Sequence, residues 1–257
     1  MRGRGWMAAG CAALVLGAGA QAISAETPRT GVPKGYLAQR DLPDGLSLLP
    51  PPPAAGSPAA AADEAYFRDT RALEGGPRWS QALADNAILE PGAFRSWSCA
   101  AGVALSSEGT PVTARLLTRI AVDAGLGTFP AKAHYDRPRP FMVTELPTCT
   151  NPEPLRGNGS YPSGHSAVGW AWALVLAQLR PDRATEILTR GREFGDSRAI
   201  CGVHYMTDVE SGRTFGAGVV ARLQASTEFQ QDLAAARAEL AGLGETAASA
   251  ACPVPAG

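Results

Sequence analysis

The sequence predicts a single all-α domain, a helical bundle. Several segments carry apolar residues at steps of three and four, the spacing that gathers them on one face of a helix, and prolines stand near the starts of these segments. No convincing alternation of apolar and polar residues marks a strand, and no internal repeat is found. About 230 residues remain after a short leader, which is enough for one sizeable core. The expected helices are residues 59–73, 77–89, 111–124, 162–179, 208–226 and 227–243, with another starting at Pro181.

Residues 1–22 predict a signal peptide. Arg2 and Arg4 give a positive start, an apolar stretch follows, and residues 20–22 offer the small-x-small pattern of a cleavage site. The apolar stretch is too short for a membrane span. A lipoprotein is the alternative, but too little apolar sequence precedes Cys11. We therefore expect an exported protein, either periplasmic or secreted.

Residues 23–57 predict an extended arm in front of the domain. The segment is rich in Pro, Gly and Ala and contains four consecutive prolines, so it should lie on the body or act as a tether. The all-α domain is expected over residues 58–245, and a tail over 246–257. Within the domain, residues 167–179 are strongly apolar but shorter than the roughly 20 residues that a bilayer requires. They predict a buried core helix, and no membrane association of the mature protein.

Charge and cysteine content narrow the class of protein further. The formal net charge is -1, whereas nucleic-acid binders usually carry a basic patch or a high pI, so no nucleic-acid partner is expected. Removing the leader leaves Cys99, Cys149, Cys201 and Cys252. An even number in an oxidising compartment, without a CxxC spacing, favours two disulfides over a metal site. Of the three possible pairings we favour Cys149–Cys201 with Cys99–Cys252, although sequence alone does not fix the connectivity.

All three histidines lie in three short segments, of which residues 197–208 are the last. His204 and Asp208 are four apart, so on a helix their side chains would share one face. A carboxylate bonded to one ring nitrogen fixes the tautomer, and it stabilises positive charge when the other nitrogen attacks an electrophile. Arg198 adds a planar fork suited to phosphate oxygens. Taken alone, the segment favours a surface His–Asp pair with a nearby Arg, because such pairs are common.

Residues 161–165 predict an anion site at a helix start. Ser163 and Gly164 can leave bare N–H groups at the N-terminus of a helix, and glycine lets a ligand approach the backbone. His165 follows at once and could reach the same anion. The alternative is a simple cap with Ser163 at the N-cap position. A cap needs no histidine, so function is favoured.

Residues 132–140 add positive charge. Lys132 and Arg139 are candidates for clamping phosphate, and the prolines on both sides of Arg139 would hold its backbone extended. For Arg137 we expect a solvated position in a basic loop. His134 is assigned a structural role as a satisfied polar residue.

Together the segments form Lys-x6-Arg-Pro, Pro-Ser-Gly-His and Ser-Arg-x5-His-x3-Asp, in that order. This signature resembles that of the acid phosphatase and vanadium haloperoxidase superfamily, which includes type 2 phosphatidic acid phosphatase-like proteins. Residues 48–53, 159–165 and 194–209 are similar to one branch, the class A bacterial non-specific acid phosphatases. That resemblance covers about residues 47–240 of this chain.

The resemblance implies an all-α fold and a two-step hydrolysis of phosphate monoesters with broad specificity. His204 would attack phosphorus to form a phosphohistidine, His165 would serve as general acid and then base, and Asp208 would orient His204. It also implies no metal or other cofactor, an acidic optimum, inhibition by phosphate and vanadate, and a possible homo-oligomer. The phosphate oxygens would be bound by Lys132, Arg139, Ser163, Gly164 and Arg198, including the amides of the Ser-Gly pair.

Other functions would use the same pocket. A vanadium-dependent haloperoxidase would hold vanadate there, and an assay with peroxide and halide would reveal it. A soluble lipid or pyrophosphate phosphatase is a further alternative, although lipid phosphatases with this signature usually carry several membrane spans. A non-catalytic anion-binding scaffold would need neither His165 nor Asp208, yet both are present.

Overall fold

The computed structural model describes Met1, residues 33–90 and residues 92–243. Apart from Met1, the predicted signal peptide lies outside the described residues, as do the start of the predicted arm and the predicted tail. The chain divides into the units Met1–Val32 and Pro33–Gly257, and all the described helices belong to the second.

The described residues form helices and no strand, which confirms the predicted fold class. Prolines open α2, α3 and α5 at their first or second positions, as predicted from the pattern. The α-helices are α1 Gly45–Leu48, α2 Pro58–Asp69, α3 Pro77–Ala84, α4 Arg95–Ala101, α5 Pro111–Leu126, α6 Phe129–Tyr135, α7 Pro140–Val143, α8 Gly164–Leu179, α9 Ala184–Ile200, α10 Met206–Leu223 and α11 Thr227–Ala241. Short 3-10 helices are η1 Gln39–Asp41, η2 Thr70–Leu73, η3 Glu153–Leu155 and η4 Pro181–Arg183.

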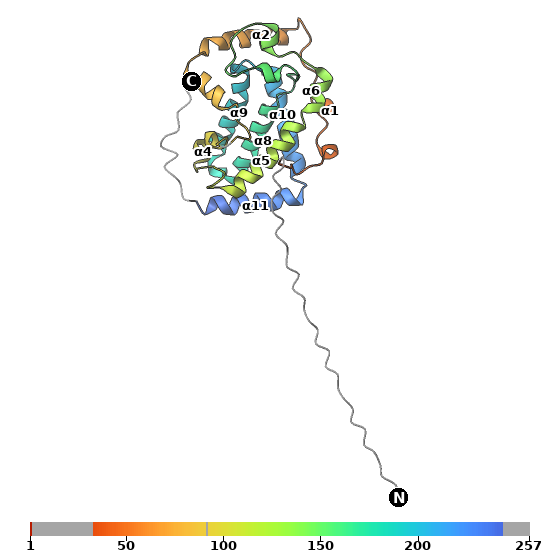
Figure 1. Cartoon of the computed structure of the whole chain (residues 1–257), viewed down its shortest axis with the longest axis vertical. Coiled ribbons are helices and arrows are strands. Elements are labelled where there is room, and N and C mark those ends of the chain that lie inside the picture. The colour runs from red at the N-terminus through yellow and green to blue at the C-terminus, as the bar shows by residue number, and fades with distance from the viewer. Residues whose placement is uncertain (2–32, 91, 244–257) are drawn as a thin grey trace. The chain divides into compact units, whose positions relative to one another are not determined.

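Helix α8 forms the centre of the domain and packs against α5, α9 and α10 (Figure 1). Ten of its sixteen residues are buried, and the face with Trp170, Leu174 and Ala177 is partly buried, which is the pattern of an internal helix. Trp172 is fully buried there, and its indole N–H donates to the Leu117 carbonyl at 2.7 Å. The predicted buried core helix is confirmed. In the described part of the chain, no helix is long and apolar enough to cross a membrane.

Two glycines bring α10 into backbone contact with α8. A Cβ added at Gly212 would lie 2.3 Å from the Ser163 carbonyl oxygen, and one at Gly216 would lie 2.3 Å from the Ala167 carbonyl oxygen. Only glycine allows such an approach. The start of α8 is therefore fixed directly against α10.

The predicted arm is less extended than expected, because residues 33–57 contain η1 and α1. Its described part is bound to the body by specific contacts. Asp123 on α5 accepts the amides of Tyr36 and Leu37 at 2.8 and 3.3 Å, and the Arg119 guanidinium lies 3.7 Å from the Tyr36 ring centroid. Further along, the Pro50 carbonyl accepts a hydrogen bond from the Tyr161 hydroxyl.

The predicted Cys149–Cys201 disulfide is present, with 4.7 Å between the Cα atoms. It links the loop after α7 to the end of α9, where the Cys149 amide also donates to the Cys201 carbonyl at 3.1 Å. The second predicted pair includes Cys252, which lies outside the described residues.

Candidate active site

The three sequence segments meet at one place in the fold. Helix α6, the residues before α7, the N-terminus of α8, the end of α9 and the turn before α10 each supply a side chain. The site residues on these elements are Lys132, Arg139, Ser163, Gly164, His165, Arg198, His204 and Asp208. Apart from Gly164 and His165, which are partly exposed, all are buried. Helix α6, which carries Lys132, was not predicted.

His204 lies in the turn before α10, so the prediction that it shares a helix face with Asp208 is wrong. Tyr205 is the N-cap of α10 and Asp208 is its third residue. The Asp208 carboxylate reaches back over the helix start, accepts the Tyr205 amide at 2.9 Å, and lies 3.4 Å from His204 Nδ1. The pair therefore forms through a capping box rather than across one helical turn.

The partners of His204 define its tautomer. A carboxylate only accepts hydrogen bonds, so Nδ1 carries the proton and Nε2 keeps its lone pair. Arg139 Nη1 lies 3.1 Å from that Nε2. Burial first, and then the three neighbouring cations, hold the pKa of His204 well below its usual range. The ring is neutral, with a lone pair in the middle of a positively charged pocket.

Asp208 is held by more donors than the sequence suggested. Ser160 Oγ donates to it at 2.7 Å and Arg137 Nη1 at 2.6 Å. The second nitrogen of Arg137, Nη2, lies 2.9 Å from Asp63 on α2, whose carboxylate also accepts the Thr207 amide at 3.0 Å. The expectation that Arg137 is solvated is therefore wrong, because its side chain is only 11% exposed and bridges two buried carboxylates.

Lys132, Arg139 and Arg198 bring three buried positive charges to the site. Their hydrogen-bond partners are neutral: Lys132 Nζ donates to the Gly159 carbonyl at 2.7 Å and Arg139 Nη1 to the Val203 carbonyl at 2.8 Å. Among the described residues, no ion pair joins any of the three cations, and the buried Nε of Arg198 has no hydrogen-bond partner. A buried cluster of cations of this kind is suited to a dianion.

The pKa values of these cations show the cost of burying them together. Burial and the neighbouring Arg139, opposed by Asp208, lower the pKa of Lys132 to about 7. Burial lowers the pKa of Arg139 to about 10, and burial with Arg139 nearby lowers that of Arg198 to about 9. A bound anion would reverse these shifts, because opposite charge favours the protonated forms.

Ser163 caps α8, as the alternative interpretation of its segment held. Its Oγ accepts the Ser166 amide at 3.2 Å, and its own amide donates to the Asp208 carbonyl at 2.9 Å. The Ser163 amide is therefore not free for an anion, in contrast to the prediction. The Gly164 amide, at the first residue of α8, and the Ser163 hydroxyl remain as candidates.

His165 is held by a residue that the sequence analysis missed. Its Nε2 lies 3.1 Å from the Asn86 carbonyl oxygen, which only accepts, so Nε2 carries a proton and Nδ1 is left for proton transfer. Burial and the nearby Arg198, outweighing that carbonyl, hold the pKa of His165 well below its usual range. No local pattern marked Asn86, because it lies 79 residues before His165.

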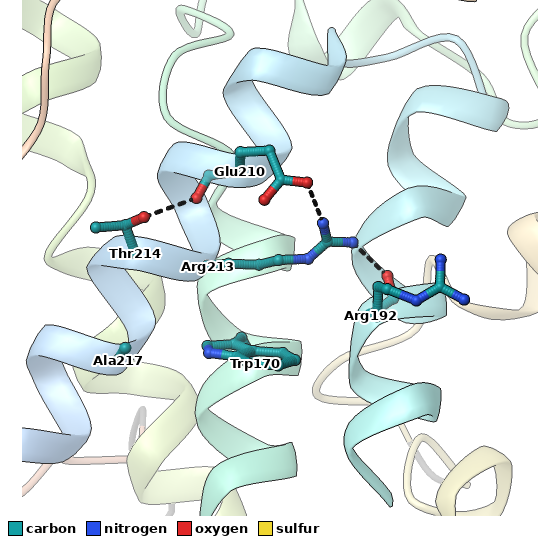
Figure 2. A pocket seen from close by; sticks show the side chains of 6 residues that line it. All are labelled: Trp170, Arg192, Glu210, Arg213, Thr214 and Ala217. Atoms are coloured by element: carbon teal, nitrogen blue, oxygen red, sulfur yellow. Dashed lines mark hydrogen bonds and ion pairs between the residues drawn. The ribbon is translucent and has the colours of Figure 1, made fainter. Parts of the chain in front are cut away.

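Other features lie outside this cluster. His134 is exposed on α6, and its ring packs edge to face with the Tyr135 ring, with 4.8 Å between the ring centroids. An open groove over α8, α9 and α10 contains none of the predicted site residues (Figure 2). Arg213 crosses that groove, but Glu210 and Asp196 already neutralise it. No three His, Cys, Asp or Glu residues in the described part of the chain are grouped so that they could hold a metal ion.

Comparison with known proteins agrees with this geometry. The model of the PAP2 superfamily matches residues 113–231, a range that contains all eight predicted site residues. A bacterial vanadium-dependent iodoperoxidase of known structure shares the fold, with a TM-score of 0.50 and 17% identity over 68% of this chain and 52% of that one. The match therefore identifies a PAP2 superfamily region over residues 113–231 of this chain.

Three curated relatives narrow the class. A non-specific acid phosphatase of Providencia stuartii is 41% identical over 81% of this chain and 85% of its own. A non-specific acid phosphatase of Salmonella typhimurium is 45% identical over 69% of this chain and 72% of its own. An acid phosphatase of Zymomonas mobilis is 38% identical over 86% of this chain and 83% of its own. The chain belongs to the family of bacterial non-specific acid phosphatases.

Proposed function

We propose that this protein is an acid phosphatase that hydrolyses phosphate monoesters through a phosphohistidine on His204. One observation carries the proposal: three buried cations act on a neutral histidine, and the guanidinium of one of them, Arg139, lies 3.1 Å from its unprotonated Nε2. Such a pocket binds a phosphate dianion and presents a nucleophile to its phosphorus. The activity named for the curated relatives supports the same conclusion.

In the first step, the lone pair of His204 Nε2 forms a bond to phosphorus while the ester P–O bond breaks. The leaving oxygen takes the proton from Nδ1 of His165, whose Nε2–H stays on the Asn86 carbonyl. His165 is neutral in the empty site, and the negative charge of the bound substrate raises its pKa so that it can be protonated. Asp208 stabilises the positive charge that develops on His204.

In the second step, water attacks the phosphohistidine. Nδ1 of His165 accepts the proton of the water, the bond between phosphorus and Nε2 of His204 breaks, and inorganic phosphate is released. Electrostatic stabilisation of the equatorial oxygens comes from Lys132, Arg139 and Arg198, with the Gly164 amide and the Ser163 hydroxyl. These groups supply the positive charge from the chain itself, so we propose that activity needs no metal.

The test is hydrolysis of an aryl phosphate by the mature chain with and without EDTA. Activity at mildly acidic pH that survives EDTA and is inhibited by vanadate and phosphate supports the proposal. His204→Ala should abolish turnover and the acid-labile phosphoprotein trapped by quenching, whereas His134→Ala, the exposed matched control, should retain both. Loss of activity with EDTA, or a phosphoprotein that persists in His204→Ala, would refute the mechanism. Vanadate-dependent oxidation of halide by peroxide would favour the haloperoxidase alternative.

We also propose that the protein acts outside the cytoplasm. The support is the signal peptide predicted over residues 1–22 and the Cys149–Cys201 disulfide, because disulfides persist mainly in oxidising compartments. Fractionation of an expressing bacterium with N-terminal sequencing of the product tests this. An uncleaved cytoplasmic product would contradict it.

A further inference from the structure

Asn86 contacts the general acid and a phosphate-binding cation with different parts of the same residue. It lies one residue past Asp85, the C-cap of α3. Its carbonyl oxygen is 3.1 Å from His165 Nε2, and its side-chain Oδ1 accepts a hydrogen bond from Arg198 Nη1 at 3.0 Å. We infer that Asn86 is a positioning residue that orients Arg198 through its side chain and His165 through its main chain. This inference rests on the proposed function.

The place of Asn86 is fixed by its neighbour. The Asp85 carboxylate is fully buried, accepts two hydrogen bonds from the Arg190 guanidinium, and accepts one from Ser197 Oγ at 2.6 Å. Ser197 directly precedes Arg198. Asp85 and Asn86, directly after α3, therefore bind Ser197 and Arg198 on α9. The buried Asp85 contacts fix the backbone from which the side-chain carboxamide of Asn86 reaches Arg198.

The chemistry of the amide suits this position. Arg198 is 1% exposed, and among the described residues only Asn86 forms a side-chain hydrogen bond with its guanidinium. A neutral oxygen orients the guanidinium and leaves its full charge for the substrate. A carboxylate at the same place would pair with Arg198 and compete with phosphate for it, because charge-assisted bidentate pairs are strong. The side chain is thus suited to orienting a cation without neutralising it.

The two contacts can be separated by mutation. The His165 contact uses the main-chain carbonyl of Asn86, which any substitution retains, whereas the Arg198 contact uses the side chain. Removing the side chain should therefore weaken phosphate binding, whereas the hydrogen bond from the main-chain carbonyl to His165 should stay in place. Asn86→Ala removes the acceptor, and Asn86→Asp keeps the shape but adds a negative charge.

The experiment measures the dissociation constant of inorganic phosphate by calorimetry at about pH 6, where an aspartate is ionised. Asn86→Ala should weaken phosphate binding roughly tenfold, because Arg198 loses the hydrogen bond that orients it. Asn86→Asp should weaken binding further, on the order of 100-fold, because it adds a negative charge that opposes the phosphate. Asn151→Asp is the matched control: Asn151 is exposed, and its Oδ1 accepts the Glu153 amide at 3.1 Å. It should bind phosphate like the wild type.

The order of the two variants distinguishes positioning from packing. A purely steric role predicts that Asp, which has the shape of Asn, is milder than Ala. Asn86→Asp binding phosphate as tightly as the wild type, or more tightly than Asn86→Ala, would overturn the inference. The pH profile of kcat in Asn86→Ala should match the wild type, and a displaced profile would refute the assignment of the His165 contact to the main chain. Thermal unfolding of each variant verifies the fold.

This titration needs no turnover, so it separates the two proposals. If the wild type binds phosphate but hydrolyses no monoester, the proposed function fails while the role of Asn86 in orienting Arg198 is still decided by the affinities.

Discussion

Replacing Arg137 with methionine should destabilise the protein strongly. Arg137 bridges Asp63 and Asp208, at 2.9 and 2.6 Å, and these carboxylates are 2% and 0% exposed. Methionine fills a similar volume but leaves two buried carboxylates close together without their cation. Breaking a buried ion pair in this way costs about 3–5 kcal/mol, because the remaining charge is left uncompensated. For a domain of this size that lowers the melting temperature by roughly 6–20 °C.

The assay is urea unfolding of the wild type, Arg137→Met, Asp63→Asn and the double variant. If the bridge is the cause, the double variant should recover part of the loss, with a coupling energy of about 1–3 kcal/mol. Activity should fall in Arg137→Met because one donor that fixes Asp208 is removed. Arg137→Met within about 0.5 kcal/mol of the wild type, the range of ordinary surface substitutions, would refute the reasoning.

Three further predictions follow from the packing and charge of the domain. Lys132→Met should abolish phosphate binding yet raise the free energy of unfolding at pH 5 by about 1–3 kcal/mol, since the buried ammonium has its pKa lowered to about 7. Between pH 7 and 10.5 Lys132 is protonated in the unfolded wild type and largely deprotonated in the folded one, so the free energy of unfolding of the wild type should increase with pH in that window. The variant lacks this group and should not show the increase. Equal pH dependence of the two proteins in urea titrations would contradict this. Gly169→Ala should lower stability by about 1–3 kcal/mol in thermal melts, since its Cβ would lie 2.3 Å from a ring carbon on α9, whereas the unobstructed Gly157→Ala should be neutral. The variant with Cys149→Ser and Cys201→Ser should lose about 2–4 kcal/mol in urea unfolding, and a smaller loss under non-reducing conditions would show that the disulfide contributes little.

The sequence was sufficient where the signal is local. The long amphipathic or apolar segments became α2, α5, α8, α10 and α11, because their periodicity extends over several turns. The seven-residue helices α4 and α6 were missed, since segments that short are helical only through tertiary contacts. The predicted helix at 77–89 ends at Ala84, where the chain turns so that Asn86 can reach α8 and α9.

As with the helices, the sequence predicted those parts of the site that have a local signal and missed those that depend on tertiary contacts. Residue type and spacing marked the candidate catalytic and phosphate-binding groups, such as His204 and Arg139. They could not mark the partners of those groups, because Asp63 and Asn86 come from distant parts of the chain and carry no distinctive pattern. For the same reason Arg137 was misassigned: a basic residue in a segment rich in basic residues suggests a solvated loop until the two carboxylates that bind it are known.

The contact of Gly212 and Gly216 with the backbone of α8 has a consequence for how this enzyme can be altered. The spacing between the strip of chain that bears Ser163 and the helix that bears Asp208 is defined by main-chain atoms, and not by the bulk of any side chain. Repacking the apolar interior elsewhere would therefore leave the dimensions of the reaction centre unchanged. Libraries aimed at new substrates should hold these two glycines constant and vary the surrounding loops.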